Sequence, residues 1–564
     1  MPYTPTRTQR RWLRLMVTGV ILALAAWAGG QWLAHTIHGR SLELVKELCG
    51  PDSRIGIGKV KVDLFAGNAE WTDIRIEQDV DSGDTAWTSN RRVLISGTVD
   101  SISVRGAALL RLVFGHTLHV RSLTIARPRL IFLMGNRADS LVEEVKDRVE
   151  ARITSLELDS LVVENGAVYT HNVQRRSGIA TLGSVDIRAT DLRCELPHGD
   201  TPLHMELGAS AMAVDSVNIS MPPLYDLRLG RVEVDHPRHS ALATGIMLMP
   251  RKGPQEYHTV VDLETDLFAL HTDTLSVHGF DMAEAINSAS FQPSWMRIAH
   301  TQLAAIRNKN MPDAPFTHKG LPARLLRAIP FDVRMDSLVV DSLNVRYMER
   351  NDMSPDFGEV TFNNIHGVVT GLNTIAGQDT GQVHLRATGH VFEQAAVTFH
   401  FVTSQSDSSD RFTVRASIGR LPFNVFNRMT DDLLNVRATA GSIGGMDLSF
   451  TGDDHTGSGR LDMEYAGLVV KIQSRDGERR EKRFLSGVVN RILRDENLRS
   501  SDTFRHGDFS IERRRDRAIF NFLWRSIRAG MMATVLPDVV SSSTKDKKDE
   551  GKGDREEKEE KEEK

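Results

Sequence analysis

The sequence predicts a mainly β fold with helical inserts, preceded by one N-terminal transmembrane helix. Three observations support this fold class. An uncharged apolar run, Leu15–Leu33, follows a basic N-terminus. Apolar and polar residues then alternate with a period of two in many segments, which is typical of strands that bury one face. Near the C-terminus, apolar residues recur at helical spacing in two segments.

The N-terminus predicts a cytoplasmic basic tail over residues 1–14 and a membrane anchor over residues 15–34. Four arginines precede the apolar run, and a basic flank of this kind stays in the cytoplasm. The run is long enough to span, because ~20 apolar helical residues cross ~30 Å of hydrocarbon. Ala26-Trp27-Ala28 resembles a small-x-small cleavage site, so a cleaved signal peptide is the alternative. The length of the run favours the anchor, and both interpretations place the bulk of the chain across a membrane.

Charge and cysteine content exclude some classes of protein. The net charge is −4, which provides no overall attraction to nucleic acid. Two cysteines, Cys49 and Cys194, are too few for a disulfide scaffold in a chain of 564 residues. Their separation leaves open whether they pair. Aromatic residues make up 6% and aliphatic residues are plentiful, which suits thin sheets better than one thick core.

Residues 35–280 are predicted to be β-rich. A helix is expected to interrupt the strands at Ala138–Arg152, and strands are expected to resume at Ile153 and continue to about His278. Clear alternation occurs in Val60–Leu64, Val93–Val104 and Leu118–Ile125.

A helical insert is predicted over residues 281–330, broken at Pro293 and Pro322. A second β-rich region is predicted over residues 331–459, and a helix entered through Pro422 is expected within it at Leu421–Leu434. Residues 538–564 are rich in Ser and then almost pure Lys, Glu and Asp, so they are expected to form a disordered charged tail.

A short motif, Asp-Ser or Asp-Thr before Leu or Val, recurs in the strand regions. Asp and Ser are turn residues, so the motif predicts a turn that feeds a strand. Its irregular spacing argues against a strict solenoid and favours one supersecondary unit reused with insertions. Ordinary hairpin turns of a β-sandwich are the alternative. The motif begins at Asp159, Asp215, Asp273, Asp336 and Asp341.

The C-terminal module, residues 460–537, is predicted to contain strands and two amphipathic helices. A basic, aromatic-containing helix can lie on an anionic membrane surface, whereas capping the end of an open sheet is the alternative that we favour. The candidates for lining a lipid groove or contacting a membrane are Phe484, Leu485, Val488, Phe520, Phe522, Trp524, Arg525 and Arg528.

No group of residues forms a recognisable catalytic set. His116 and His119 lie three apart on an expected strand, so they would point to opposite faces and not chelate together. Asp453-Asp454-His455 resembles a calcium ligand set, but a hairpin turn explains it with fewer assumptions. No nucleophile elbow, dinucleotide loop or Walker lysine loop occurs. We therefore predict a protein that is not an enzyme, with no catalytic, cofactor or metal site.

Three segments of the C-terminal module resemble the AsmA-like family of Gram-negative envelopes. They are Met463-Glu-Tyr-Ala-Gly-Leu-Val-Val, Phe484-Leu-Ser-Gly-Val-Val-Asn and Arg515-Asp-Arg-Ala-Ile-Phe-Asn-Phe-Leu-Trp-Arg-Ser-Ile-Arg-Ala-Gly. The resemblance implies an inner-membrane helix with the N-terminus in the cytoplasm and the bulk in the periplasm. It further implies an elongated, twisted antiparallel β-sheet that forms an apolar groove, similar to bridge-like lipid-transfer proteins.

The function implied by this resemblance is the binding or conduction of lipids in phospholipid transport or outer-membrane biogenesis. The expected partners are a phospholipid or other membrane lipid, the inner membrane and other envelope proteins, with no nucleic acid. An anchored β-scaffold or interaction protein of the cell envelope, without lipid transport, is the alternative.

Overall fold

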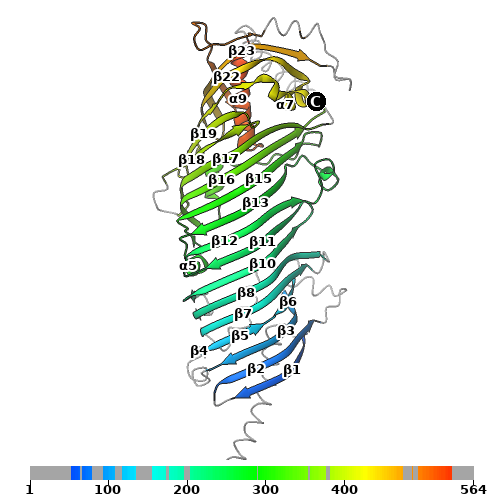
Figure 1. Cartoon of the computed structure of the whole chain (residues 1–564), viewed down its shortest axis with the longest axis vertical. Coiled ribbons are helices and arrows are strands. Elements are labelled where there is room, and N and C mark those ends of the chain that lie inside the picture. The colour runs from blue at the N-terminus through cyan, green and yellow to red at the C-terminus, as the bar shows by residue number, and fades with distance from the viewer. Residues whose placement is uncertain are drawn as a thin grey trace, which may run out of the picture. The chain divides into compact units, whose positions relative to one another are not determined.

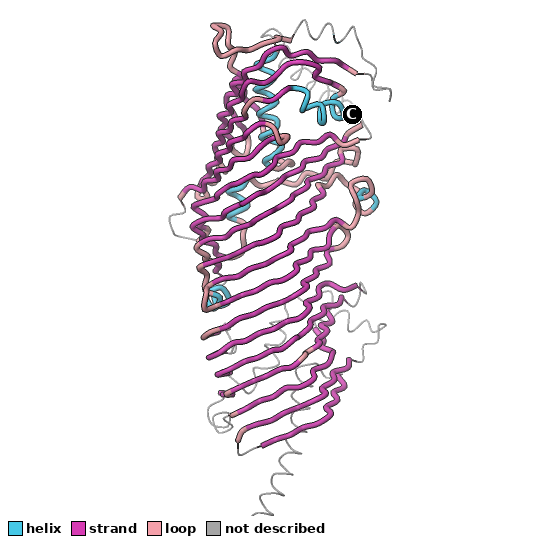
Figure 2. The backbone as a smooth tube through the Cα atoms, viewed as in Figure 1, coloured by secondary structure: helices cyan, strands magenta, loops and turns pink. Residues whose placement is uncertain are grey.

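The computed structural model confirms that the chain is mainly β. It describes residues 53–63, 66–78, 93–107, 117–134, 155–172, 177–195, 204–288, 290–352, 356–375, 381–473, 486 and 493–536. Three predicted elements lie outside these residues: the membrane anchor, the helix at Ala138–Arg152 and the charged tail. Among the helices of the described residues, none combines the length and hydropathy that crossing a bilayer requires. Figure 2 shows how strongly strands dominate the described backbone.

The chain divides into two compact units, one formed by residues 1–220 and 230–237 and the other by residues 221–229 and 238–564. The strand β11 (Tyr225–Asp235) is divided between them. The other strands of the first unit are β1 (Ser53–Asp63), β2 (Asn68–Gln78), β3 (Val93–Arg105), β4 (Thr117–Val120), β5 (Ser122–Ala126), β6 (Arg129–Met134), β7 (Ser155–Asn172), β8 (Ser177–Glu195), β9 (His204–Glu206) and β10 (Ser210–Met221).

The sheet of the first unit is mixed, which corrects the expectation of a purely antiparallel sheet. β1, β2 and β3 pair antiparallel in sequence order, as do β7, β8 and β10. In contrast, β4, β5 and β6 all pair parallel with β7. A parallel pair needs a crossover connection rather than a tight hairpin, and the chain between β6 and β7, residues 135–154, is long enough to supply one.

The second unit holds the remaining elements. They are β12 (Ser240–Pro250), η1 (Tyr257–Thr259), β13 (Leu267–His278), α5 (Met282–Ser288), β14 (Ser290–Phe291), β15 (Trp295–Asn308), α6 (Pro322–Arg327), β16 (Asp332–Arg350), β17 (Gly358–Asn373), β18 (Gln382–Val391), β19 (Ala395–Ser404), β20 (Phe412–Ile418), β21 (Leu421–Pro422), η2 (Phe423–Phe426), α7 (Asn427–Leu434), β22 (Val436–Gly452), β23 (Thr456–Ile472), β24 (Gly507–Glu512) and α9 (Ile519–Val535).

The helical insert predicted over residues 281–330 is wrong at its centre. Only α5 and α6 are helical, and between them β15 forms a strand of 14 residues that pairs with β13 and β16. β15 and β16 are parallel, and the segment that contains α6 is their crossover. The helix predicted at Leu421–Leu434 is confirmed for its second half as α7.

From β16 to β23 the long strands of the second unit pair antiparallel with their neighbours (Figure 1). β24 adds to β23, and α9 lies against both of these strands. The first strand of the predicted C-terminal module belongs to β23, which begins before the module at Thr456.

The recurring Asp-Ser motif does not open strands, which corrects the turn interpretation. Asp215-Ser216 lies inside β10 and Asp341-Ser342 inside β16. Both serines have positive φ, 56° and 57° respectively. At Ser342 the register between β16 and β17 shifts by one residue, which is the signature of a β-bulge.

Comparable bulge positions recur on neighbouring strands of each sheet. In the second unit, His300 of β15 and Asn364 of β17 also have positive φ and flank Ser342 in the register. In the first unit, Asn165 of β7 lies opposite the Val185 region of β8, which pairs with the Ser216 region of β10. An extra residue in a strand bends it, increases its twist and reverses which face the following side chains take. The motif therefore sets the curvature of long strands instead of ending them.

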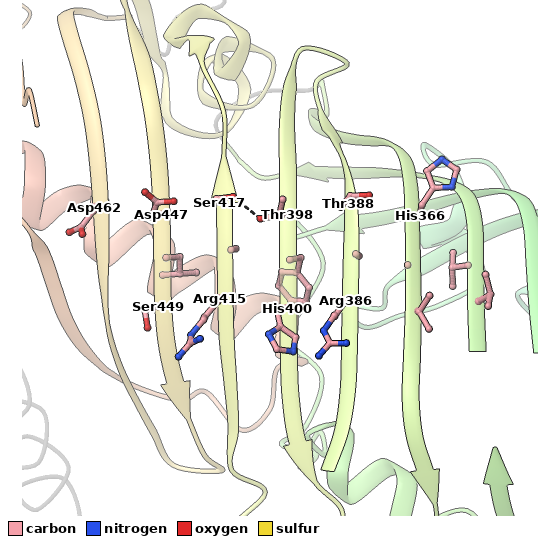
Figure 3. A pocket seen from close by; sticks show the side chains of 18 of the residues that line it. His366, Arg386, Thr388, Thr398, His400, Arg415, Ser417, Asp447, Ser449 and Asp462 are labelled. Atoms are coloured by element: carbon pink, nitrogen blue, oxygen red, sulfur yellow. Dashed lines mark hydrogen bonds between the residues drawn. The ribbon is translucent and has the colours of Figure 1, made fainter. Parts of the chain in front are cut away.

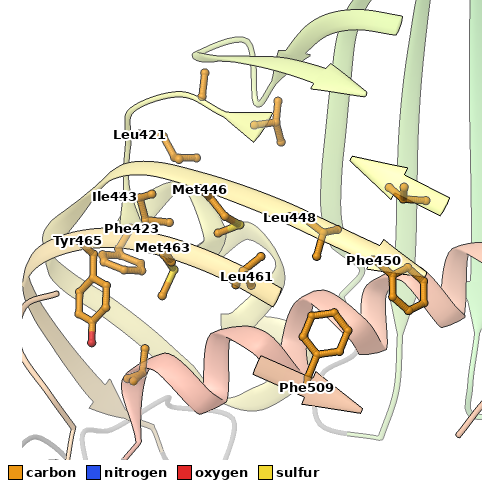
Figure 4. Close-up of a cluster of buried hydrophobic side chains, with 14 of the residues drawn as sticks. Leu421, Phe423, Ile443, Met446, Leu448, Phe450, Leu461, Met463, Tyr465 and Phe509 are labelled. Carbon is orange, nitrogen blue, oxygen red and sulfur yellow. The ribbon is translucent and has the colours of Figure 1, made fainter. Parts of the chain in front are cut away.

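A large hydrophobic cluster in the second unit joins the sheet to α9. Figure 4 shows Leu448, Phe450 and Leu461 on the side of the sheet where α9 lies, with Phe509 of β24 beside the helix. Phe522 of α9 packs edge-on against Phe450, with ring centroids 5.2 Å apart. α9 therefore packs directly against the last strands of the sheet.

Candidate functional site

One face of the second unit's sheet carries apolar rows that cross many strands. Because paired residues of neighbouring strands lie on the same face, the register determines each row. One row consists of Leu275, Ile298, Val340, Gly367, Ala387, Phe399, Ala416, Leu448 and Leu461. A neighbouring row on the same face consists of Val277, Met296, Leu338, Val369, Leu385, Phe401, Val414 and Phe450.

The bulges keep the apolar residues on this face over the whole length of the strands. In β16, Leu338 and Val340 are on the apolar face before the bulge, and Leu343 and Val345 are on it afterwards. The alternation therefore changes phase at Ser342. Without the extra residue, the polar side chains of the second half of β16 would lie on the apolar face of the sheet.

The apolar face is covered at one end of the sheet. α9 and the strands around it bury the apolar-face residues at this end of β20, β22 and β23, and Leu461 and Met463 are both 0% exposed. Gly530 of α9 allows close contact, because a Cβ atom there would come within 2.5 Å of the Leu461 Cβ. The helix thus rests directly on the sheet.

The same face is open between β13 and β17. No helix or second sheet of the described residues buries the row formed by Leu270, Leu303, Val345 and Phe362. Phe268 on β13 and Phe362 on β17 are 40% and 36% exposed, although large aromatic side chains are usually buried. We call Phe268, Leu270, Leu303, Val345 and Phe362 the open apolar face.

A row of two threonines lies beside the open apolar face, but it presents no polar group to a ligand. Thr272 and Thr301 lie next to Leu270 and Leu303 on the same side of their strands. Their hydroxyl oxygens are 3.1 Å apart and hydrogen-bond to each other, and both residues are buried. A ligand on this face would therefore meet hydrocarbon without a fixed polar contact.

The first unit shows the same pattern of apolar rows. One row is Val60, Trp71, Ile102, Ile125, Val163, Ile187 and Met212. Ile74, Ile76 and Val99 form a small buried cluster there, with Trp71, Ile102 and Ile125 only partly buried against it. A core of this size is a thin layer on one face rather than the filling between two sheets.

The predicted groove or membrane-contact residues of α9 fall into two groups. Phe522 is buried against the sheet at 2% exposure, whereas Phe520 is 79% and Trp524 is 41% exposed. Arg525 donates a hydrogen bond from Nη1 to the carbonyl oxygen of Glu512, at 2.9 Å, and so joins the helix to β24. Arg528 is exposed. Phe484, Leu485 and Val488 lie outside the described residues.

The calcium alternative for Asp453-Asp454-His455 does not fit the contacts, and the turn interpretation does. Asp453 Oδ1 accepts hydrogen bonds from the backbone N–H groups of His455 and Thr456, both at 2.8 Å. The buried Asp454 carboxylate instead forms ion pairs with Arg513 and with His318, whose Nε2 lies 2.9 Å away. Cations of the protein thus already occupy the one buried carboxylate of the motif.

His119 and His236 have ordinary structural contacts. His119 Nε2 lies 3.0 Å from Asp159 Oδ1, and His236 Nδ1 lies 2.7 Å from the Gly208 carbonyl oxygen. Within the part of the chain that the structure describes, no group of three or more His, Cys, Asp or Glu side chains is placed to hold a metal ion. Cys194 is a buried thiol on β8, and burial raises its pKa. Cys49 lies outside the described residues.

Comparison with known proteins adds no assignment. No protein-family model matches the chain, and no curated protein matches it.

Proposed function

We propose that the protein binds lipid acyl chains along the open apolar face of its second unit. One observation carries this proposal. Rows of aliphatic and aromatic side chains begin in the buried core around α9 and continue onto strands where no described residue covers these side chains. An apolar sheet face left in water is unfavourable, and a hydrocarbon ligand relieves this without polar recognition.

The energy of such binding comes from the transfer of hydrocarbon out of water. Each buried CH₂ group contributes about 0.8 kcal/mol, so two acyl chains are enough for firm retention. The burial of Thr272 and Thr301 favours this ligand class, because their hydroxyls bond to each other beneath the surface and are not presented to a ligand.

The proposal includes the cellular setting that the AsmA-like resemblance implies. In that setting, Leu15–Leu33 anchors the chain in the inner membrane, the body lies in the periplasm, and bound phospholipid is conducted during outer-membrane biogenesis. Two features support this setting: the arginine-flanked apolar run at the N-terminus and an amphipathic helix, α9, that caps one end of an apolar sheet face.

Site-specific photocrosslinking in bacterial membranes tests acyl-chain binding. A photoreactive phenylalanine analogue is placed in the full-length chain at Leu303, on the open apolar face, or at Gln302, the next residue of β15, which faces the opposite side. We expect mass spectrometry to find phospholipid adducts at position 303 and not at position 302.

Equal labelling at both positions would contradict binding to one face. Absence of adducts at either position would favour the alternative function, an anchored β-scaffold or interaction protein of the envelope.

A further inference from the structure

A cavity of about 1000 Å³ lies across β16–β23 in the second unit. The side chains that point into it come from the polar face of the sheet, opposite the apolar rows, because Arg386, His400 and Arg415 alternate with Ala387, Phe399 and Ala416. Figure 3 shows Arg386 and Arg415 on either side of His400, all three directed the same way from adjacent strands.

The acidic side chains of this cavity already have partners in the protein. Asp341 pairs with Arg297 and with His366, whose Nδ1 lies 2.9 Å away. At the other end of the cavity, Asp447 pairs with Arg499, and the Asp462 carboxylate lies 2.7 Å from His506 Nδ1.

The central arginines of the cavity differ from the one at its edge. Arg460, at the edge, pairs with Asp508 at 2.7 Å. For Arg386 and Arg415, no carboxylate of the described residues lies within salt-bridge distance. The centre of the cavity therefore holds two guanidinium groups that no carboxylate in the described part of the chain pairs with.

His400 reports the positive potential between these two arginines. Desolvation lowers its pKa, and the charges of Arg386, His384 and Arg415 lower it further. The imidazole ring stacks on that of His384, with centroids 5.8 Å apart. Its Nε2 atom is shielded from solvent and has no hydrogen-bond partner among the described residues. An anion above this ring would gain from the two guanidinium charges on either side of it.

We propose that this cavity binds a phosphate group, carried by a soluble phosphomonoester or by a lipid headgroup. Arg386 and Arg415 are separated by one strand, so their Cα atoms are about 10 Å apart. Arginine side chains are long enough to converge from this separation, and the planar guanidinium binds phosphate oxygens in a bidentate manner.

Hydroxyl groups in the adjacent row of the same face add hydrogen-bonding capacity. Thr388, Thr398 and Ser417 line the cavity on β18, β19 and β20. The Thr398 and Ser417 oxygens are 2.6 Å apart and bond to each other, so each keeps acceptor or donor capacity for a ligand. A phosphate, with several acceptor oxygens, suits this mixture of guanidinium and hydroxyl groups.

This site is independent of acyl-chain binding, because the two lie on opposite faces of one sheet. A matched pair of lipids separates them. Phosphatidate and diacylglycerol carry the same acyl chains, and only phosphatidate carries a phosphomonoester. Binding of diacylglycerol thus reports on the apolar face alone.

The test uses the full-length chain in a neutral detergent. It is titrated calorimetrically at low salt with inorganic phosphate, with glycerol 3-phosphate, and with micelles containing phosphatidate or diacylglycerol. The test variant is R386Q/R415Q. The control is R188Q/R228Q, which removes the same charge from two exposed arginines, on β8 and β11, that do not line the cavity.

We expect R386Q/R415Q to bind the phosphate ligand about a hundredfold more weakly, about tenfold for each guanidinium lost, and the control to bind as the wild type does. Binding of inorganic phosphate or glycerol 3-phosphate would identify a soluble ligand. A preference for phosphatidate over diacylglycerol, without soluble binding, would identify a lipid headgroup. Equal phosphate binding by the wild type and R386Q/R415Q, or no phosphate-dependent binding by the wild type, would overturn the proposal.

Discussion

At the residue scale, Asp454 joins segments of the second unit that are far apart in the sequence. Its carboxylate contacts Arg513, just after β24, and His318, in the crossover before α6. The Arg513 side chain is 0% exposed, so Asp454 is the counterion of a fully buried cation. Burial alone would raise the pKa of Asp454, but the hydrogen bond from His318 and the charges of His318, Arg513 and Arg324 outweigh it and lower the pKa.

We predict that Asp454→Asn lowers the free energy of unfolding at pH 7 by about 3–5 kcal/mol, because it leaves Arg513 buried without a counterion. A carboxyl group with a lowered folded-state pKa stabilises the fold above its ordinary value of 3.8 and loses this effect as the pH falls through the folded-state pKa. The difference between wild type and variant should therefore shrink below about pH 3.8. Urea unfolding at several pH values measures it.

Asp453→Asn is the matched control, because an amide oxygen can still accept the backbone hydrogen bonds of the turn. Similar losses in both variants would show that the turn, and not the ion pair, carries the stabilisation.

At the element scale, bulges explain why the Asp-Ser motif is misleading in the sequence. Asp, Ser and Asn adopt positive φ more easily than most residues, so the same chemistry suits turns and bulges. The sequence does contain a signal that separates the two. Apolar residues alternate on both sides of Asp341-Ser342 but change phase across it, whereas a hairpin would bring a polar loop.

The packing of α9 on the sheet depends on glycine. We predict that Gly530→Val lowers the melting temperature strongly, because a side chain there would overlap Leu461 and the helix would have to move off β23 and β24. Met532→Val is the control, since position 532 is 48% exposed and the same β-branched residue enters the same helix. Circular dichroism melts of both variants measure the effect. Equal melting temperatures would mean that the helix does not rest on the sheet at Gly530.

At the scale of the whole molecule, the sequence was sufficient for the mainly β class, for the helix α9 and for much of the strand placement. It was not sufficient for β15, because Pro293 and Pro322 suggested broken helices, while β15 depends on pairing with β13 and β16. The open apolar face and the cavity around His400 also depend on register. Arg386, His400 and Arg415 are 14 and 15 residues apart in the sequence and become neighbours only when β18, β19 and β20 pair.

One part of the apolar sheet face is covered and another part is open. This difference leads to a prediction for two quantities, the free energy of unfolding and the amount of co-purified phospholipid. Leu303→Glu, on the open part, should cost only about 1 kcal/mol of stability, because the side chain is only partly buried, yet should strongly reduce co-purified phospholipid. Leu461→Glu, on the covered part, should cost more than about 4 kcal/mol, because it buries a charge at a 0% exposed position. Gln302→Glu adds the same charge on the opposite face of β15 and should change neither quantity.

Urea unfolding gives the stabilities and quantitative mass spectrometry of the purified full-length chain gives the lipid content. If Leu303→Glu destabilised the fold as much as Leu461→Glu, a covering layer would lie over β15 and the open apolar face would not exist.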